Sequence, residues 1–301
     1  MIKIAYSPVY KYTLPEGHRF PMEKYELVPE QLLYEGTITR EQFFHPDRLS
    51  EEEILLTHTP EYLGKLLHQN LSSKEIRRIG FPMRPELIHR GRYISMGTYQ
   101  CALFAREYGI SLNIAGGTHH AYAGHGEGFC IFNDIAIASN LLLRDDPEMQ
   151  ILIIDLDVHQ GNGSADIFKN DNRVYTFSMH GKNNYPHKKE KSDWDIPLNN
   201  QTGDYEYLQV LQTALLQLHT IVNPNIIFYL SGVDVLYSDK LGKLAMTLDG
   251  ARRRDEMVFE FAIKKSIPVV VSMGGGYSKK LTHIIEAHAN TYRVAMGMFD
   301  E

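Results

Sequence analysis

Short apolar runs that alternate with longer amphipathic stretches constrain the fold of this chain more than any other feature. The runs are rich in β-branched residues and have the length of strands. Several are almost wholly apolar, as expected for strands covered on both faces. Strands that alternate with helices require right-handed crossovers, so the pattern predicts an α/β fold with a mainly parallel sheet. The predicted strands are Ile2–Tyr6, Ser111–Ala115, Gln150–Asp157, Val174–Met179, Asn225–Ser231 and Ile267–Met273.

Helix signals lie between these runs. Ser50, followed three residues later by Glu53, forms the capping-box pattern of a helix start. A long amphipathic stretch runs from Pro85 to Tyr108, and Gly109 fits its C-terminal stop. Further helices are predicted near Asp134–Leu143, Tyr205–Ile221, Ala251–Lys265 and Lys279–Ala289.

Two regions, Tyr6–Phe20 and His180–Gly203, show little regular pattern. We expect them to be long loops, which often carry function in compact domains. No linker rich in proline, glycine or serine divides the chain. The prediction is therefore a single α/β domain over residues 1–301.

Composition excludes several classes of protein. Two cysteines cannot build a disulfide scaffold or a thiolate metal site, and they fit a reducing compartment. A net charge of -6 argues against a nucleic-acid binder, and the Arg252–Arg254 run, with acidic neighbours, is expected to be a solvated helix face. No apolar run could cross a bilayer, and Met1–Pro8 lacks the apolar region of a signal peptide. These features predict a cytoplasmic protein without a membrane span.

Each inner strand is followed at once by a polar or glycine-rich cluster. In an open parallel sheet, ligands bind outside the carboxyl ends of the strands. Separate segments therefore converge on one edge of the sheet, which is stronger evidence for a site than any single motif. The clusters are Gly116–His120, Asp155–Gly163, Ser178–His180, Ser231–Asp234 and Ser272–Tyr277.

Asp155, Asp157 and His159 have the spacing of a metal site, because alternate side chains of a strand share one face. Asp234, at the end of another strand, can complete a set of two carboxylates and one imidazole. Three protein ligands leave room for water and substrate, as in catalytic zinc sites, and the same ligands suit Fe²⁺. A solvated loop with capping aspartates is the alternative interpretation.

Histidine and tyrosine follow two of the glycine clusters. The backbone after Gly116–Gly117 is free to bend, so His119 and His120 can reach one pocket and supply a proton shuttle. Tyr277 follows three glycines and can donate a hydrogen bond to a developing oxyanion. Surface polarity for the histidines and a helix-entry turn for the tyrosine are the alternatives.

Together these motifs resemble the zinc-dependent histone deacetylase family, in the arginase/deacetylase fold. They occur in the family's order and extend over most of the chain. The compact length and the stretch Leu14–Met22 look most like the class IV branch and its bacterial relatives. The resemblance implies a three-layer domain with helices on both faces of the sheet. The motifs that carry it are Gly116–Ala121, Gly128–Asp134, Asp155–His159, Gly232–Asp234 and Gly274–Tyr277.

The resemblance also implies a role for each catalytic residue. His120 would be the general base and then the general acid, with Asn162 as its hydrogen-bond partner. Some relatives have Asp in place of Asn162, and without that negative charge we expect a lower pKa for His120. His119 would be an electrostatic partner oriented by Asp155, and Tyr277 would polarise the scissile carbonyl.

Ion sites and a substrate tunnel are implied in the same way. Zn²⁺, or Fe²⁺ in its place, would be one catalytic ion, and K⁺ or Na⁺ would be structural. The catalytic ligands would be Asp157, His159 and Asp234; the structural cation would lie near Asp155, Asp157, His159, Ser178 and Met179, with a second site near Phe168 and Val174. The tunnel would be lined by Gly128, Phe129, Tyr185, Leu241 and Gly275, with Tyr185 facing Phe129 and Arg19 as an internal arginine behind the metal.

The expected activity is hydrolysis of the amide of acyl-lysine in proteins or peptides, with acetyl or longer fatty acyl groups. The same chemistry on acetylated polyamines or other small amides is the alternative. A non-catalytic protein that binds acyl-lysine, or a binuclear arginase-like hydrolase, is less favoured, because the catalytic positions are filled and a second-metal pattern is missing. The stretch Lys182–Lys191 is predicted to form the rim of the site.

Overall fold

Residues 1–299 of the protein are described by a computed structural model. Their strands form one sheet in the order β2-β1-β3-β8-β7-β4-β5-β6, and every neighbouring pair is parallel. The predicted α/β class is confirmed, and the sheet is wholly rather than mainly parallel. The strands are β1 Lys3–Ala5, β2 Phe43–Phe44, β3 Ile110–Asn113, β4 Ile151–Asp155, β5 Val174–Gly181, β6 Trp194–Leu198, β7 Ile226–Gly232 and β8 Val269–Gly274.

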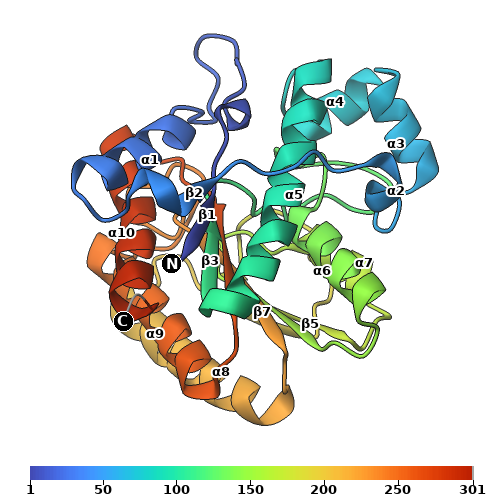
Figure 1. The fold of residues 1–301 in the computed structure, drawn as a ribbon. Helices are drawn as coiled ribbons and strands as arrows, with labels where there is room; N and C mark the ends of the chain where they lie inside the picture. The colour runs from blue at the N-terminus through green and yellow to red at the C-terminus, as the bar shows by residue number, and fades with distance from the viewer. Residues whose placement is uncertain (300–301) are drawn as a thin grey trace.

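Helices cover both faces of this sheet and make the three layers that the resemblance implied (Figure 1). One layer contains α1 Lys24–Tyr34, α8 Asp204–Ile221, α9 Leu248–Lys265 and α10 Leu281–Phe299. The other contains α5 Pro85–Tyr108, α6 Asp134–Asp145 and α7 Asn162–Phe168, with the short helices α2 Glu51–Ile54, α3 Pro60–Leu67 and α4 Ser73–Ile79 beyond α5. Among residues 1–299, no helix is both long and apolar enough to span a bilayer.

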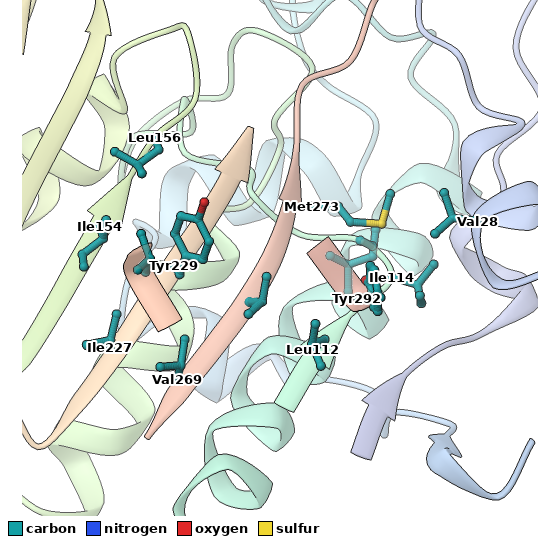
Figure 2. Close-up of a cluster of buried hydrophobic side chains, with 14 of the residues drawn as sticks. Val28, Leu112, Ile114, Ile154, Leu156, Ile227, Tyr229, Val269, Met273 and Tyr292 are labelled. Carbon is teal, nitrogen blue, oxygen red and sulfur yellow. The ribbon is translucent and has the colours of Figure 1, made fainter. Parts of the chain in front are cut away.

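Successive residues of the central strands belong to different cores. On β4, Leu152 and Ile154 join the core beneath α8, α9 and α10, whereas Ile151 and Ile153 join the core beneath α5 and α6. Figure 2 shows the first of these cores, where Ile154 lies beside Tyr229 of the neighbouring strand β7. Burial on both faces explains why these strands are continuous apolar runs.

The structure differs from the predicted elements in the helices α1, α4 and α7, which were not predicted, and at the margin of the sheet. His180–Gly203 was expected to be a loop, but it contains the edge strand β6, which pairs with β5. β6 is only partly buried and includes Pro197, which an edge strand tolerates because one side needs no ladder bond. Its sequence therefore lacks the apolar signature of the inner strands. The two-residue strand β2 was also missed.

Arg254 corrects the expectation of a solvated arginine run. Arg252 and Arg253 do lie at the surface, but the Arg254 side chain is 0% exposed. Its guanidinium donates to the carbonyl oxygens of Leu156 and Gly232 and to the Asp255 carboxylate. It therefore ties the ends of β4 and β7, the two strands that lead into the predicted metal ligands. The correction arises because a helix turns neighbouring residues to different faces.

We predict that Arg254→Met destabilises the fold by about 3–5 kcal/mol, because Asp255 would remain buried without its ionic partner. Arg253→Met is the matched control on the same helix. Its side chain is 49% exposed, so we expect a change within about 0.5 kcal/mol. Urea unfolding of both variants measures the difference, and equal midpoints would contradict the role given to Arg254.

Candidate active site

A small pocket lies where the carboxyl ends of β3, β4, β7 and β8 meet, at the edge where the sequence predicted a site. Its volume is about 40 Å³. Segments far apart in the chain supply its walls, as expected for loops that follow parallel strands. The predicted site residues that line it are His119, His120, Gly128, Phe129, Asp157, His159, Asp234, Gly275 and Tyr277.

Asp157, His159 and Asp234 form a buried cluster whose ligand atoms all lie within 4.8 Å of one another. Nδ1 of His159 is 3.0 Å from Oδ1 of Asp157 and 3.1 Å from Oδ2 of Asp234. β4 ends at Asp155, so Asp157 and His159 project from the following turn rather than from the strand itself. The turn nevertheless brings the predicted ligands together.

The cluster has the chemistry of a divalent-cation site. Burial and the neighbouring Asp157 raise the pKa of Asp234 to about 7, so a positive charge between the carboxylates would be strongly stabilising. Oδ2 of Asp234 is buried without a hydrogen-bond donor. At Gly275 (φ +57°) a Cβ atom would collide with that same oxygen, so only glycine permits this close approach. Two carboxylate oxygens and one imidazole nitrogen suit Zn²⁺ or Fe²⁺.

The two consecutive histidines lie beside each other, with ring centroids 4.1 Å apart, but they differ in charge. Burial opposes a charge on His119, yet its Nδ1 lies 2.7 Å from the Asp155 carboxylate, which raises the pKa of His119 to about 9. Burial and the neighbouring His119 lower the pKa of His120 well below its usual value. Nδ1 of His120 donates to Oδ1 of Asn162 over 2.6 Å. His119 is thus a cation and His120 a neutral base.

Asp134 holds the turn that presents both histidines, a role that the sequence reasoning did not assign to it. Its carboxylate accepts hydrogen bonds from the backbone N–H and hydroxyl of Thr118, over 2.7 and 2.6 Å, and from the backbone N–H of Gly117. Asp134 begins α6 and is 0% exposed. In the sequence Asp134 is simply an aspartate at the start of a helix, and such a residue is readily explained by its favourable interaction with the helix dipole.

Tyr277 lines the same pocket as the two histidines, and its backbone is held in place. Its N–H donates to Oδ2 of Asp239 over 2.6 Å, and its ring packs 6.0 Å from those of Phe20 and Phe129. Burial and the charge of Asp234 raise the pKa of Tyr277 well above its usual value. The phenol therefore stays protonated and able to donate. Asp239 was not singled out in the sequence, because nothing local connects it with Tyr277.

Of the predicted tunnel residues, Gly128, Phe129 and Gly275 line the pocket. Gly128 and Phe129 both have positive φ, and a Cβ atom at Gly128 would lie 2.6 Å from the ring of His120. The ring of Tyr185 packs edge-on against His120, with centroids 5.0 Å apart. Leu241 adjoins the Tyr185 segment, where its carbonyl accepts a hydrogen bond from Asn184. Whether Tyr185 faces Phe129 across a substrate stays a prediction.

Arg19 is not the internal arginine that the resemblance implied. Its side chain is exposed, and its guanidinium lies over the ring of Phe129, 4.9 Å from the ring centroid. The buried cations of the pocket are instead Arg90, on α5, and Lys24, at the start of α1, with exposures of 5% and 2%. Arg90 could have been identified in the sequence as an arginine on the apolar face of a predicted helix. The prediction of Arg19 came instead from its position in a short motif.

The residues predicted around a structural cation lie beyond His119. Asp155 and Ser178 are direct neighbours across β4 and β5, and Met179 follows Ser178. Phe168 and Val174 are both buried, at the end of α7 and at the start of β5. The two cation sites stay predictions.

Comparisons with known proteins agree with this fold. The histone deacetylase domain matches residues 18–292. The chain is 40% identical to an uncharacterized protein of Picosynechococcus sp. over 98% of this chain and 99% of that one. It is 32% identical to histone deacetylase 2 of Arabidopsis thaliana over 94% of this chain and 76% of that protein. The crystal structure of an HDAC homologue from Aquifex aeolicus has a TM-score of 0.84 at 22% identity, and the match covers 98% of this chain and 84% of that one. The chain therefore belongs to the histone deacetylase family of amide hydrolases.

Proposed function

We propose that this protein is a metal-dependent deacylase that hydrolyses the amide of an acylated lysine and releases a carboxylate and the free amine. One observation carries the proposal: the buried Asp157–His159–Asp234 cluster shares a pocket with a neutral histidine, His120, and a protonated phenol, Tyr277. Amide hydrolysis needs electrophilic activation, a base and an oxyanion donor, and these side chains can supply all of them.

Asp157, His159 and Asp234 would hold the catalytic ion, Zn²⁺ or Fe²⁺. Such an ion, when bound, polarises an acyl carbonyl and lowers the pKa of water. A potassium or sodium ion near Asp155 and Ser178 is a further part of the proposal, supported by the pairing of these residues across β4 and β5. The proposal also includes a single catalytic domain over residues 1–301 and a cytoplasmic location.

His120 is suited to move the proton in both halves of the reaction. Its Nδ1 is occupied by Asn162, so the lone pair of Nε2 is available to take a proton from water. The low pKa of His120 keeps that lone pair free before reaction and makes its imidazolium a strong acid for the departing amine. His119, held protonated by Asp155, places a fixed positive charge beside the reaction.

Tyr277 is suited to stabilise the negative charge that develops on the carbonyl oxygen. Its high pKa keeps the proton on the phenol, and Asp239 fixes the backbone that carries it. Arg90 and Lys24 are buried cations that line the pocket, and Lys24 donates to the carbonyl of Gly275 over 2.6 Å. These two cations could hold the carboxylate product, which was the role expected of Arg19.

We predict that the purified protein binds about one divalent ion per chain, because the cluster has one set of three ligands. Asp234→Asn removes a ligand charge and should lose most of the bound metal. Asp249→Asn, at an exposed site on α9, is the control and should keep it. Metal counting by mass spectrometry measures both, and two ions per chain would favour an arginase-like site instead.

We predict that Tyr277→Phe lowers kcat by about 10²–10³-fold, the usual loss on removal of one oxyanion donor. Metal content should not change, because Tyr277 is not one of the clustered ligands. The control is Tyr237→Phe, whose side chain is 63% exposed. Steady-state kinetics on an acetyl-lysine peptide provide the measurement. Turnover equal to that of the unaltered protein would remove the role assigned to Tyr277.

We predict a preference for short acyl groups, because the pocket, with a volume of about 40 Å³, is small for a long fatty acyl chain. On one lysine peptide, kcat/KM should fall from acetyl to myristoyl. Acetylated polyamines form a parallel series that separates peptide from small-amine substrates. Faster hydrolysis of myristoyl-lysine would contradict the size argument, and no hydrolysis in either series with zinc bound would indicate a non-catalytic binding protein.

A further inference from the structure

The carboxylate of Glu127 lies behind Asn162, on the side away from His120, and is only 8% exposed. Oε1 of Glu127 accepts a hydrogen bond from Nδ2 of Asn162 over 2.6 Å. The hydroxyl of Tyr185 donates to the same oxygen, also over 2.6 Å. Glu127, Asn162 and His120 thus form a continuous hydrogen-bonded row, with 2.6 Å in each of its two steps.

The row has only one consistent arrangement of protons. An ionised carboxylate only accepts hydrogen bonds, so Glu127 must face the NH₂ group of Asn162. The amide oxygen of Asn162 is then turned toward His120 and can only accept. Nδ1 of His120 must therefore carry the hydrogen, which leaves the lone pair on Nε2. The second hydrogen of the Asn162 amide is used as well, because Nδ2 also donates to the Tyr122 hydroxyl over 3.0 Å.

Glu127 supplies this arrangement with a negative charge. Burial raises the pKa of Glu127, but hydrogen bonds from His125, Tyr185 and Asn162 outweigh it, so the net shift is downward. A carboxylate that accepts from the NH₂ group polarises the amide and makes its oxygen a better acceptor, because linked hydrogen bonds strengthen one another.

The loop that carries Glu127 does not need this side chain for its fold. The backbone N–H of Gly128 donates to the carbonyl of Arg78, and that of Phe129 donates to the carbonyl of Ile79. The N–H of Cys130 donates to the carbonyl of Glu127 over 2.9 Å. These bonds use main-chain atoms only, so they remain when the carboxylate is replaced by an amide.

We propose that Glu127 is a positioning residue that acts through Asn162 to hold His120 in its Nδ1–H tautomer and to stabilise the imidazolium formed during turnover. The inference rests on the proposed function, because it assigns His120 as the proton carrier. In this arrangement the Glu127 carboxylate supports the catalytic histidine from the far side of the Asn162 amide. Tyr185, which donates to Glu127 and packs on His120, couples the tunnel wall to the same row.

A charge exchange between positions 127 and 162 tests the proposal. Glu127→Gln keeps the shape but loses the charge, and it should lower kcat by about tenfold, part of the 10²–10⁴-fold that general acid–base catalysis contributes. KM should change little. Asn162→Asp would place two carboxylates 2.6 Å apart and should also lower kcat. The double variant again pairs one carboxylate with one amide, and its kcat should exceed that of either single variant.

Glu107→Gln is the matched control, since it makes the same chemical change at an exposed glutamate near the end of α5. It should retain nearly full kcat. Thermal unfolding and metal content establish that each variant is folded and loaded. Unchanged kcat in Glu127→Gln would overturn the proposal. A double variant slower than both single variants would also overturn it, because two unrelated structural defects would add their effects instead of compensating.

Nitrogen-15 NMR of the imidazole rings gives a readout that does not depend on turnover. His120 should be the Nδ1–H tautomer in the unaltered protein, and the Nε2–H tautomer should appear in Glu127→Gln, because a glutamine amide can face Asn162 either way round. The same tautomer in both proteins would contradict the inference. If the unaltered protein loaded with zinc hydrolyses no acyl-amine, the proposed function fails. The tautomer of His120 in the NMR spectrum still tests whether Glu127 acts on His120 through Asn162.

Discussion

Carboxylates buried at one edge of the sheet each require a donor or a cation, and this requirement organises the structure around the site. Asp155 is paired with His119, Asp134 with the turn before the histidines, and Asp255 with Arg254. A buried charge without a partner costs several kcal/mol, so each pairing fixes the position of two segments. The site is rigid because it is built from such pairs, whereas the Asp157–His159–Asp234 cluster sets two carboxylates against one imidazole and keeps an excess of negative charge.

That excess separates the catalytic centre from the carboxylates around it. Asp134 and Asp155 are satisfied by donors of the protein, whereas Oδ2 of Asp234 is buried without one. The same distinction divides the histidines. His119 is charged because a carboxylate contacts it directly, whereas His120 is neutral because it is buried beside the charged His119. One arrangement of donors and acceptors thus provides a cation site, a fixed positive charge and a free base within a single pocket.

Much of the fold could be predicted from the sequence, because strands that are buried on both faces appear in it as nearly continuous apolar runs. The inner strands are largely apolar, and the long helix α5 has the predicted bounds of Pro85 and Tyr108. β6 has no such run, since an edge strand is covered on fewer sides and tolerates proline. Arg254 and Arg90 were also missed, because charge in a sequence normally indicates exposure, and only their partners in space offset the cost of burial.

Local patterns in the chain were enough to establish the class of the fold, the edge of the sheet that holds the site, and most of the residues that meet there. Strand periodicity and the polar clusters after each strand are properties of neighbouring residues, so the amino-acid order alone reveals them. Packing in three dimensions was needed to show that Arg90 and Lys24, rather than Arg19, are the internal cations and that Glu127 lies behind Asn162. These contacts join residues from separate loops and helices. Their distances depend on how the elements pack, which no local pattern encodes.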